Sequence, residues 1–296
     1  MFTRSTPGQV GQAGLFVVHL ADLPTHGGEA IRQNASGEPA MGRETRYYYP
    51  FDGVDHPGGL QTLGQLVFVA SDCDKVEQCG PHTFVDVLDL SEPAAPAALL
   101  QRLRIGDQGE PGNVDTITSV AVTRLETGHV LLFVLGKDAL HEGWFYVSDR
   151  TTIDRETRWL YRGYWTRPLG IRDEYQSTTF VSECETGDIF MFGTGNGEFD
   201  EASVLVGDAL GKAPGTDSMS LLKLARDDQG QLAMDVVGTR SFDPGGDGYC
   251  TFRAAASVHP TPAHSLAVYC SARKAQTDLL GRPDSKLKLE EFAFVP

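Results

Sequence analysis

Ser119-Val-Ala-Val-Thr-Arg-Leu-Glu-Thr-Gly128-His-Val-Leu-Leu-Phe-Val134 is the stretch that decides the fold. Two runs of mainly β-branched and apolar residues flank a short segment that ends in glycine. This pattern predicts a β-hairpin, because glycine supplies the positive φ that a tight turn requires. No window of the chain carries the i, i+3, i+4, i+7 apolar spacing of an amphipathic helix over several turns, so we expect an all-β protein.

Weaker copies of this hairpin occur three more times. The turns fall at Gly64, Gly128, Gly187 and His264, which lie 64, 59 and 77 residues apart. Further strand candidates follow each hairpin and complete units of four antiparallel strands, the repeat of a β-propeller. These candidates are Thr83–Leu88 and Ala97–Ile105, Trp144–Val147 and Arg158–Thr166, Met219–Ala225 and Leu232–Phe242, and Lys286–Phe294.

The length of 296 residues fits a single propeller domain of about four blades. The last unit lacks a fourth strand, and we expect the N-terminal strand 14–20 to close the ring beside Leu287–Phe294. A fifth blade built from residues 15–50 is the alternative, and another two-sheet β architecture is a second one. The expected blades of the domain 1–296 are 51–108, 109–168, 169–243 and 244–296 plus the strand 14–20.

The composition excludes several classes of partner. Asp and Glu number 40 against 25 Lys and Arg, a formal net charge of −15, which disfavours nucleic acids and anionic membranes. No apolar run approaches the roughly 18 residues of a membrane-spanning helix. The five cysteines are an odd count, and the N-terminus has no signal-like apolar run, so we expect a cytoplasmic protein. An exported protein whose signal has been removed is the alternative.

Short motifs link the chain to known propellers. Phe84-Val-Asp-Val-Leu-Asp-Leu-Ser-Glu-Pro93 and the Leu-rich strand after it resemble an LVIVD-type blade. The chain is also similar, more faintly, to propeller proteins of crocagin-type clusters for ribosomally made, modified peptides. That resemblance implies that the protein handles a peptide precursor. Over about residues 50–296 the chain resembles a poorly characterised bacterial propeller-like group through His56–Gln61, Tyr175–Ser177, Phe252–Ala255 and Glu290–Phe292.

The first strand of each blade lines the channel of a propeller, so polar residues that begin these strands are expected to converge at one mouth. His56, Asp115 and Glu174 form a candidate catalytic acid/base set. Structural roles remain open for each residue, such as a turn at His56 or an ion pair of Arg253 across the channel. The candidate ligand-binding residues are Gln61, Thr116, Tyr175, Gln176 and Arg253, the last suited to bidentate binding of a carboxylate.

Metal and cofactor motifs are absent from the sequence, so we expect neither. The acidic residues of the Gly-rich loop at 196–200 favour a solvated loop over a calcium site. A different pattern is the alternation of Trp159, Tyr161 and Trp165, which predicts one aromatic face. This face is either a seam between blades or an exposed platform for a sugar or peptide.

These features favour a propeller that binds a peptide or small ligand at one mouth of its channel. We expect it to act in the maturation of a bacterial specialised metabolite, with a pathway protein as a further partner. One alternative is a metal-independent peptide-tailoring enzyme that uses the acid/base residues at the mouth. The other is an exported, lectin-like propeller.

Overall fold

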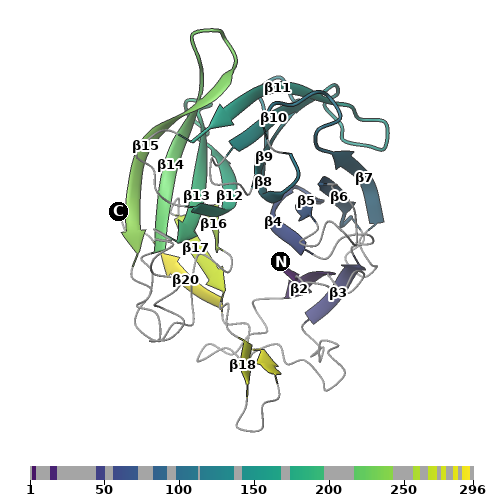
Figure 1. Ribbon diagram of the computed structural model, residues 1–296, viewed down its shortest axis with the longest axis vertical. Helices are drawn as coiled ribbons and strands as arrows, with labels where there is room; N and C mark the ends of the chain where they lie inside the picture. Colours follow the sequence, from purple (N-terminus) through teal and green to yellow (C-terminus); the bar gives the residue numbers. More distant parts are fainter. Residues whose placement is uncertain are drawn as a thin grey trace.

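The protein is an all-β propeller whose antiparallel sheets are arranged around a common centre in the computed structural model (Figure 1). No helix occurs in the described residues, and none of them forms a helical span suited to crossing a membrane. The structure describes residues 2–4, 14–18, 45–50, 56–72, 83–91, 98–112, 114–136, 142–167, 174–196, 217–242, 256–260, 266–271, 275–277, 283–285 and 289–293.

Three sheets are complete four-stranded blades, and their strands neighbour one another in sequence order, as the repeats predict. The first blade comprises β4 (His56–Leu63), β5 (Leu66–Asp72), β6 (Phe84–Asp89) and β7 (Ala98–Arg104). The second comprises β8 (Ile117–Arg124), β9 (Val130–Gly136), β10 (Glu142–Ser148) and β11 (Trp159–Thr166). The third comprises β12 (Glu174–Ser182), β13 (Ile189–Asn196), β14 (Asp217–Arg226) and β15 (Leu232–Phe242).

The inner hairpin of each complete blade turns at the predicted glycine. Gly64, Gly128 and Gly187 have φ values of 61°, 83° and 76°. Only glycine adopts this left-handed region at little cost, so the turns fix the register of β4–β5, β8–β9 and β12–β13.

The N-terminal strand does not close the ring in the way that the sequence predicted. β2 (Gly14–Val18) pairs on its two edges with β1 (Phe2–Arg4) and β3 (Thr45–Pro50), which leaves no edge for the predicted pairing beside Leu287–Phe294. β1, β2 and β3 therefore form a three-stranded sheet of their own, and two of these strands, apart from Gly14, lie in the range 15–50 of the five-blade alternative. The last sheets comprise β16 (Ala256–Pro260), β17 (Leu266–Ser271) and β20 (Leu289–Ala293), and the small pair β18 (Ala275–Thr277) and β19 (Pro283–Ser285).

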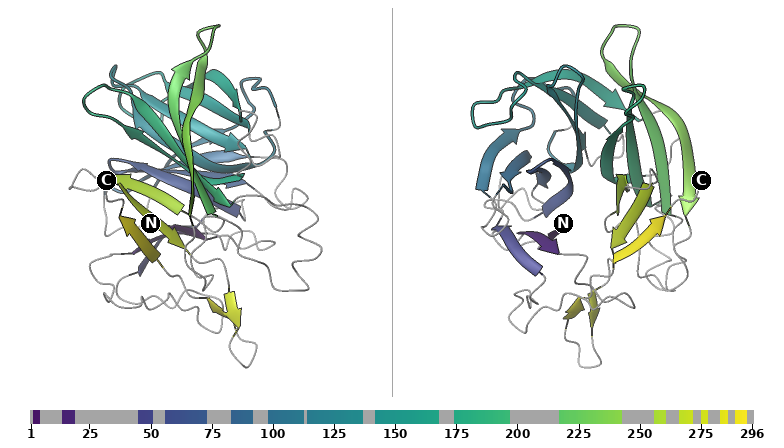
Figure 2. Two further views of the ribbon diagram at one scale, coloured as in Figure 1. Left: turned by 90° about the vertical axis from the view of Figure 1, so that its left-hand side faces the viewer. Right: turned by 180° about the vertical axis from the view of Figure 1, so that it is seen from behind.

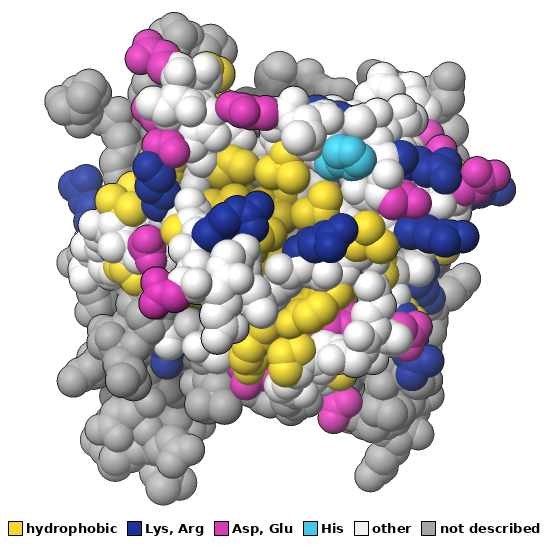
Figure 3. All heavy atoms as spheres, turned by 90° about the horizontal axis from the view of Figure 1, so that it is seen from above, with side chains coloured by type: hydrophobic (Ala, Val, Ile, Leu, Met, Phe, Trp, Pro, Cys, Tyr) yellow, Lys and Arg dark blue, Asp and Glu magenta, His cyan; other side chains and the backbone are white. Residues whose placement is uncertain are grey.

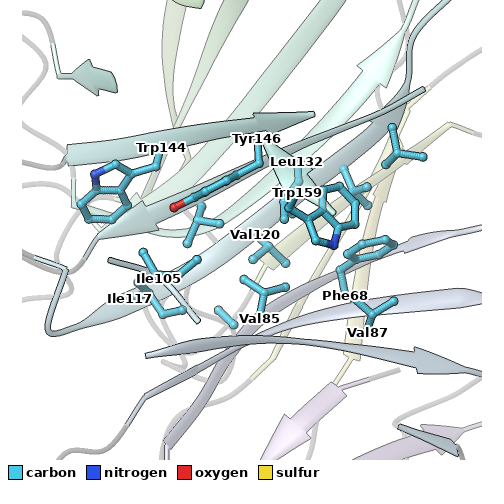
Figure 4. Close-up of a cluster of buried hydrophobic side chains, with 14 of the residues drawn as sticks. Phe68, Val85, Val87, Ile105, Ile117, Val120, Leu132, Trp144, Tyr146 and Trp159 are labelled. Carbon is cyan, nitrogen blue, oxygen red and sulfur yellow. The ribbon is translucent and has the colours of Figure 1, made fainter. Parts of the chain in front are cut away.

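Apolar clusters join each sheet to the next. Between the first and second blades, Phe68, Val85 and Val87 face Val120, Leu132 and Trp159 (Figure 4). Each fully buried side chain of this size contributes roughly 1.5–3 kcal/mol. Similar clusters form between the second and third blades, between Leu15 and the first blade, and between the third blade and β16–β17.

The aromatic alternation of β11 does not produce one face. Trp159 packs toward the first blade, whereas Trp165 packs toward the third. The pairing of β10 with β11 shifts between Phe145 and Tyr146, which makes Arg162 an extra residue and reverses the parity of the strand. Both indole rings are 4% exposed, so they belong to the seams between blades rather than to an exposed platform.

The outer surface differs from the seams. The β14–β15 hairpin extends beyond the neighbouring blades (Figure 2), and Val236 and Val237 of β15 are the exposed large hydrophobic residues of the described chain. Seen from above, this side shows hydrophobic side chains interspersed with Lys and Arg (Figure 3). Elsewhere in the second blade, Arg150 has three acidic neighbours, Asp149, Asp154 and Glu156.

Candidate functional site

The inner strands β4, β8 and β12 begin at the same end of the ring. A Cβ atom on Gly58 would overlap the carbonyl oxygen of Thr118, so β4 and β8 touch backbone to backbone. A Cβ atom on Gly59 would lie 2.6 Å from Cβ of Ser119 and 3.6 Å from the carbonyl oxygen of Gln176. The starts of all three strands thus meet at one mouth, which we call the inner-strand mouth.

Each inner strand contains a β-bulge near this mouth. The register shifts between Pro57 and Leu60 in β4, between Ile117 and Ser119 in β8, and between Tyr175 and Ser177 in β12. An extra residue bends a strand and redirects its side chains, and bulges are frequent beside functional sites.

The bulge in β4 aligns a histidine with a carboxylate. His56 lies opposite Asp72, and its Nδ1 donates a hydrogen bond of 2.6 Å to Asp72 Oδ1. The Asp72 side chain is completely buried, whereas that of His56 is 26% exposed. The tautomer that donates from Nδ1 carries its lone pair on Nε2, so the carboxylate orients the imidazole for accepting a proton or a hydrogen bond.

Buried polar atoms without a hydrogen-bond partner within the described residues lie at strand ends on the same side of the ring as this mouth. Leaving such an atom unsatisfied costs about 1–3 kcal/mol, so each calls for water or a ligand. Those found in the described part of the chain lie at the ends of β5 and β11 or at the starts of β8 and β14. They include Ser71 Oγ, Asp72 Oδ2, Thr116 Oγ1, Thr118 Oγ1, Trp165 Nε1 and Ser218 Oγ.

The centre between the three blades is filled rather than open. Gln61 Oε1 accepts from the backbone N–H groups of Val122 and Phe180, both at 2.9 Å, and its Nε2 donates to the Phe180 carbonyl at 2.9 Å. This one amide therefore joins β4 to β8 and β12. Hydroxyl pairs between Ser119 and Thr178 and between Thr123 and Ser182, each at 2.8 Å, join β8 to β12.

The predicted site residues have different environments. Asp115 is exposed immediately before β8, and Thr116 beside it is half-buried. Tyr175 is 1% exposed and packs its ring against Gly193, inside the cluster between the second and third blades. Gln176 occupies the bulge of β12, Glu174 begins that strand opposite Asn196, and Arg253 lies outside the described residues.

The structure thus brings together the strand starts that carry His56, Thr116 and Gln176. The side chain of Gln61 is hydrogen-bonded to backbone groups of β8 and β12. Asp72 and Thr118 are the residues that sequence reasoning missed. Asp72 ends an apolar strand, and a regular hairpin with its turn at Gly64 would place Pro57 opposite it. The pair of glycines after Pro57 is the signal for the bulge that moves His56 into that position.

Other buried carboxylates of these blades have partners. Tyr146 donates a 2.6 Å hydrogen bond to Glu110, and Arg102 binds Asp86 through Nε at 2.6 Å and Nη2 at 2.9 Å. Burial raises the pKa of Asp86, which the bond and charge of Arg102 oppose. Burial and the bond to Glu110 raise the pKa of Tyr146. Asp72 differs from both carboxylates, because one of its oxygens is unpartnered within the described residues.

Comparisons with known proteins give a fold-level likeness alone. No family model and no curated protein matches the sequence, and no LVIVD-type or crocagin-type relationship is shown. A galactose-bound exo-β-1,3-galactanase from Phanerochaete chrysosporium matches with 9% identity and a TM-score of 0.42, over 83% of this chain and 47% of its own. A GH43 β-xylosidase/α-arabinofuranosidase from a compost metagenome matches with 13% identity and a TM-score of 0.43, over 75% and 70%.

A galactanase from Clostridium thermocellum matches with 9% identity and a TM-score of 0.36, over 81% of this chain and 45% of its own. The chain therefore spans about half the length of the galactanases. No activity is carried over at these identities and TM-scores.

Proposed function

We propose that the protein binds a small polar ligand, with a short peptide as the favoured class, at the inner-strand mouth. The observation that carries this proposal is that Oδ2 of Asp72 and Oγ1 of Thr118 are buried without a partner among the described residues, where β4 and β5 meet β8. A ligand that donates hydrogen bonds would satisfy these carboxylate and hydroxyl oxygens, which otherwise have no partner in the described part of the chain.

Charge favours a basic or zwitterionic peptide. The chain has a formal net charge of −15, which attracts cations and repels polyanions. Asp72, one of the acidic residues in this total, lies buried at the mouth itself. A role in the maturation of a ribosomally made peptide, which the resemblance to crocagin-type propellers suggested, belongs to this proposal.

Calorimetric titration with a panel of short peptides that differ only in net charge tests the binding. We expect basic peptides to bind and acidic ones to fail. His56→Gln should weaken binding about tenfold or more, because the imidazole that holds the Asp72 carboxylate in place at the mouth is lost. The matched control is Thr186→Ala in the β12–β13 turn at the opposite end, which should bind as the wild type does. Equal binding by His56→Gln and wild type would refute the proposal.

A second candidate function is general-base chemistry on the bound peptide. The hydrogen bond between His56 Nδ1 and the buried Asp72 carboxylate favours it, because such a pairing fixes the orientation of an imidazole that acts as a general base. Mass spectrometry of peptides incubated with the protein tests it. A covalent change that is lost in His56→Gln supports catalysis, and peptides that bind but never change show that the protein only binds.

A further inference from the structure

The face on which Asp72 lies follows from the strand that carries it. Alternate residues of a strand point to opposite sides, and β5 pairs with β6 without a register shift. Phe68 and Ala70 pack into the cluster with the second blade, whereas Val67 and Val69 pack toward Leu15. Asp72 continues the face of Phe68 and Ala70, so its carboxylate lies toward the junction with β8.

At this junction the Asp72 carboxylate accepts from His56 at Oδ1, and its Oδ2 has no hydrogen-bond partner within the described residues. Thr118 occupies the bulge of β8 against Gly58, and its buried hydroxyl has no partner within the described residues. The arginines of β7 are bound elsewhere, Arg102 by Asp86 and Arg104 by Asp107. A neutral or anionic ligand group would leave the Asp72 carboxylate poorly compensated.

The hydrogen bonding of the Asp72 carboxylate decides whether a guanidinium or an ammonium group fits this junction better. A guanidinium binds best when both oxygens accept in parallel, but one acceptor position of Oδ1 is already taken by His56. An ammonium is a compact charge with three donors, and it needs one carboxylate oxygen plus scattered hydroxyl or carbonyl acceptors. Asp72 Oδ2 and Thr118 Oγ1 are such acceptors.

We propose that this junction is a subsite for a primary ammonium group and that His56, by holding Oδ1, makes it select ammonium over guanidinium. The inference rests on the proposed ligand-binding function and names the chemical group that the site takes. A peptide N-terminus and a lysine side chain share this chemistry.

Titration of the whole protein with butylammonium and with butylguanidinium, followed by the amide resonances of Asp72 and Thr118, tests the selectivity. We expect butylammonium to bind about tenfold more tightly, the factor associated with one charge-assisted hydrogen bond. Asp72→Asn should lose this binding. Asp188→Asn, which removes the same charge from the ion pair with Lys223 near the β12–β13 turn, should keep it.

His56→Ala provides the second arm, which does not depend on the stability of Asp72→Asn. Releasing Oδ1 should shift the ratio of the two affinities about tenfold toward butylguanidinium. Equal affinities in the wild type, or an unchanged ratio in His56→Ala, would overturn the subsite. Peptide binding that still requires His56 would then leave the proposed function standing.

Two peptide arms distinguish the sources of the ammonium. If the N-terminus is recognised, acetylation of the α-amino group of a lysine-free peptide abolishes binding. If a lysine side chain is recognised, an α-acetylated peptide with one lysine binds and its Nε-acetylated form does not. Binding that survives both acetylations contradicts the subsite.

Discussion

His56 and Asp72 face each other across the β4–β5 hairpin because β4 has one residue more than β5 between Pro57 and Leu60. Leu60 pairs with Val69, so a regular strand would bring Pro57 opposite Asp72. The Gly58-Gly59 bulge therefore builds the 2.6 Å contact between the imidazole and the buried carboxylate.

Gly58→Ala should disrupt this alignment. The added Cβ meets the backbone carbonyl of Thr118, which cannot rotate away, so we expect a loss of about 1–3 kcal/mol in the free energy of unfolding. Gly238→Ala in β15 is the control, because nothing lies within 4 Å of its added Cβ and its stability should hardly change. Urea denaturation of both variants measures the difference, and equal stabilities would contradict the close approach of β4 to β8.

Gln61→Leu should destabilise the ring strongly. It removes the side-chain partners of the Val122 N–H and of both backbone groups of Phe180. At about 1 kcal/mol or more for each group, the expected loss is roughly 3 kcal/mol. Gln61→Glu keeps an acceptor for the two N–H groups but places a carboxylate against the Phe180 carbonyl. Thermal unfolding should show both variants below the wild type, and an unchanged melting temperature would contradict the three-strand bridge.

Arg102→Met should leave Asp86 as an uncompensated buried charge, with a loss of about 3–5 kcal/mol near neutral pH. Burial raises the pKa of Asp86 in the folded protein. The stability that this shift contributes is therefore full below the pKa of Asp86 in the unfolded chain, and it is lost as pH rises through the pKa of Asp86 in the folded protein. Removing Arg102 removes the opposing effect, so the variant should recover stability toward acidic pH. Asp86→Asn added to Arg102→Met should restore most of the loss, and additive losses in this cycle would show that the pair is not coupled.

Tyr146→Phe should cost about 1–3 kcal/mol, because Glu110 loses the hydroxyl that donates to it. Burial and the bond to Glu110 raise the pKa of Tyr146 above its ordinary 10.0. The stability from the protonated phenol is therefore complete below pH 10.0 and is lost as pH rises through the folded value. Urea unfolding below and above pH 10.0 should show a shallower alkaline loss in Tyr146→Phe than in the wild type, and identical slopes would refute the assignment.

Sequence predicted the local β structure well, because turn glycines and apolar runs act at short range. The hairpins at Gly64, Gly128 and Gly187 and the strand Leu232–Phe242 were confirmed. The predicted pairing of the N-terminal strand with Leu287–Phe294 was wrong, because β2 pairs with β1 and β3. The apolar pattern of β2 predicts a strand but does not indicate which strand it pairs with.

The sequence analysis proposed where a site would lie, at the starts of the inner strands, but it did not predict any side-chain contact there. The starts of the inner strands meet at Gly58, Gly59 and Thr118, and one extra residue in each strand decides which side chains face one another. The bulges put Asp72 opposite His56 and separate Trp165 from Trp159, and alternation alone detects neither. The role of Gln61 depends on the approach of β4 to β12, residues 119 positions apart, which no local pattern encodes.

Amide chemical-shift mapping of a bound basic peptide tests the central claim most directly. We expect the shifted amides to cluster at the inner-strand mouth, at His56, Asp72, Thr118 and Gln176, and we expect His56→Gln to diminish these shifts. Shifts confined to the hairpin turns at Gly64, Gly128 and Gly187, at the opposite end of the same strands, would contradict the central claim.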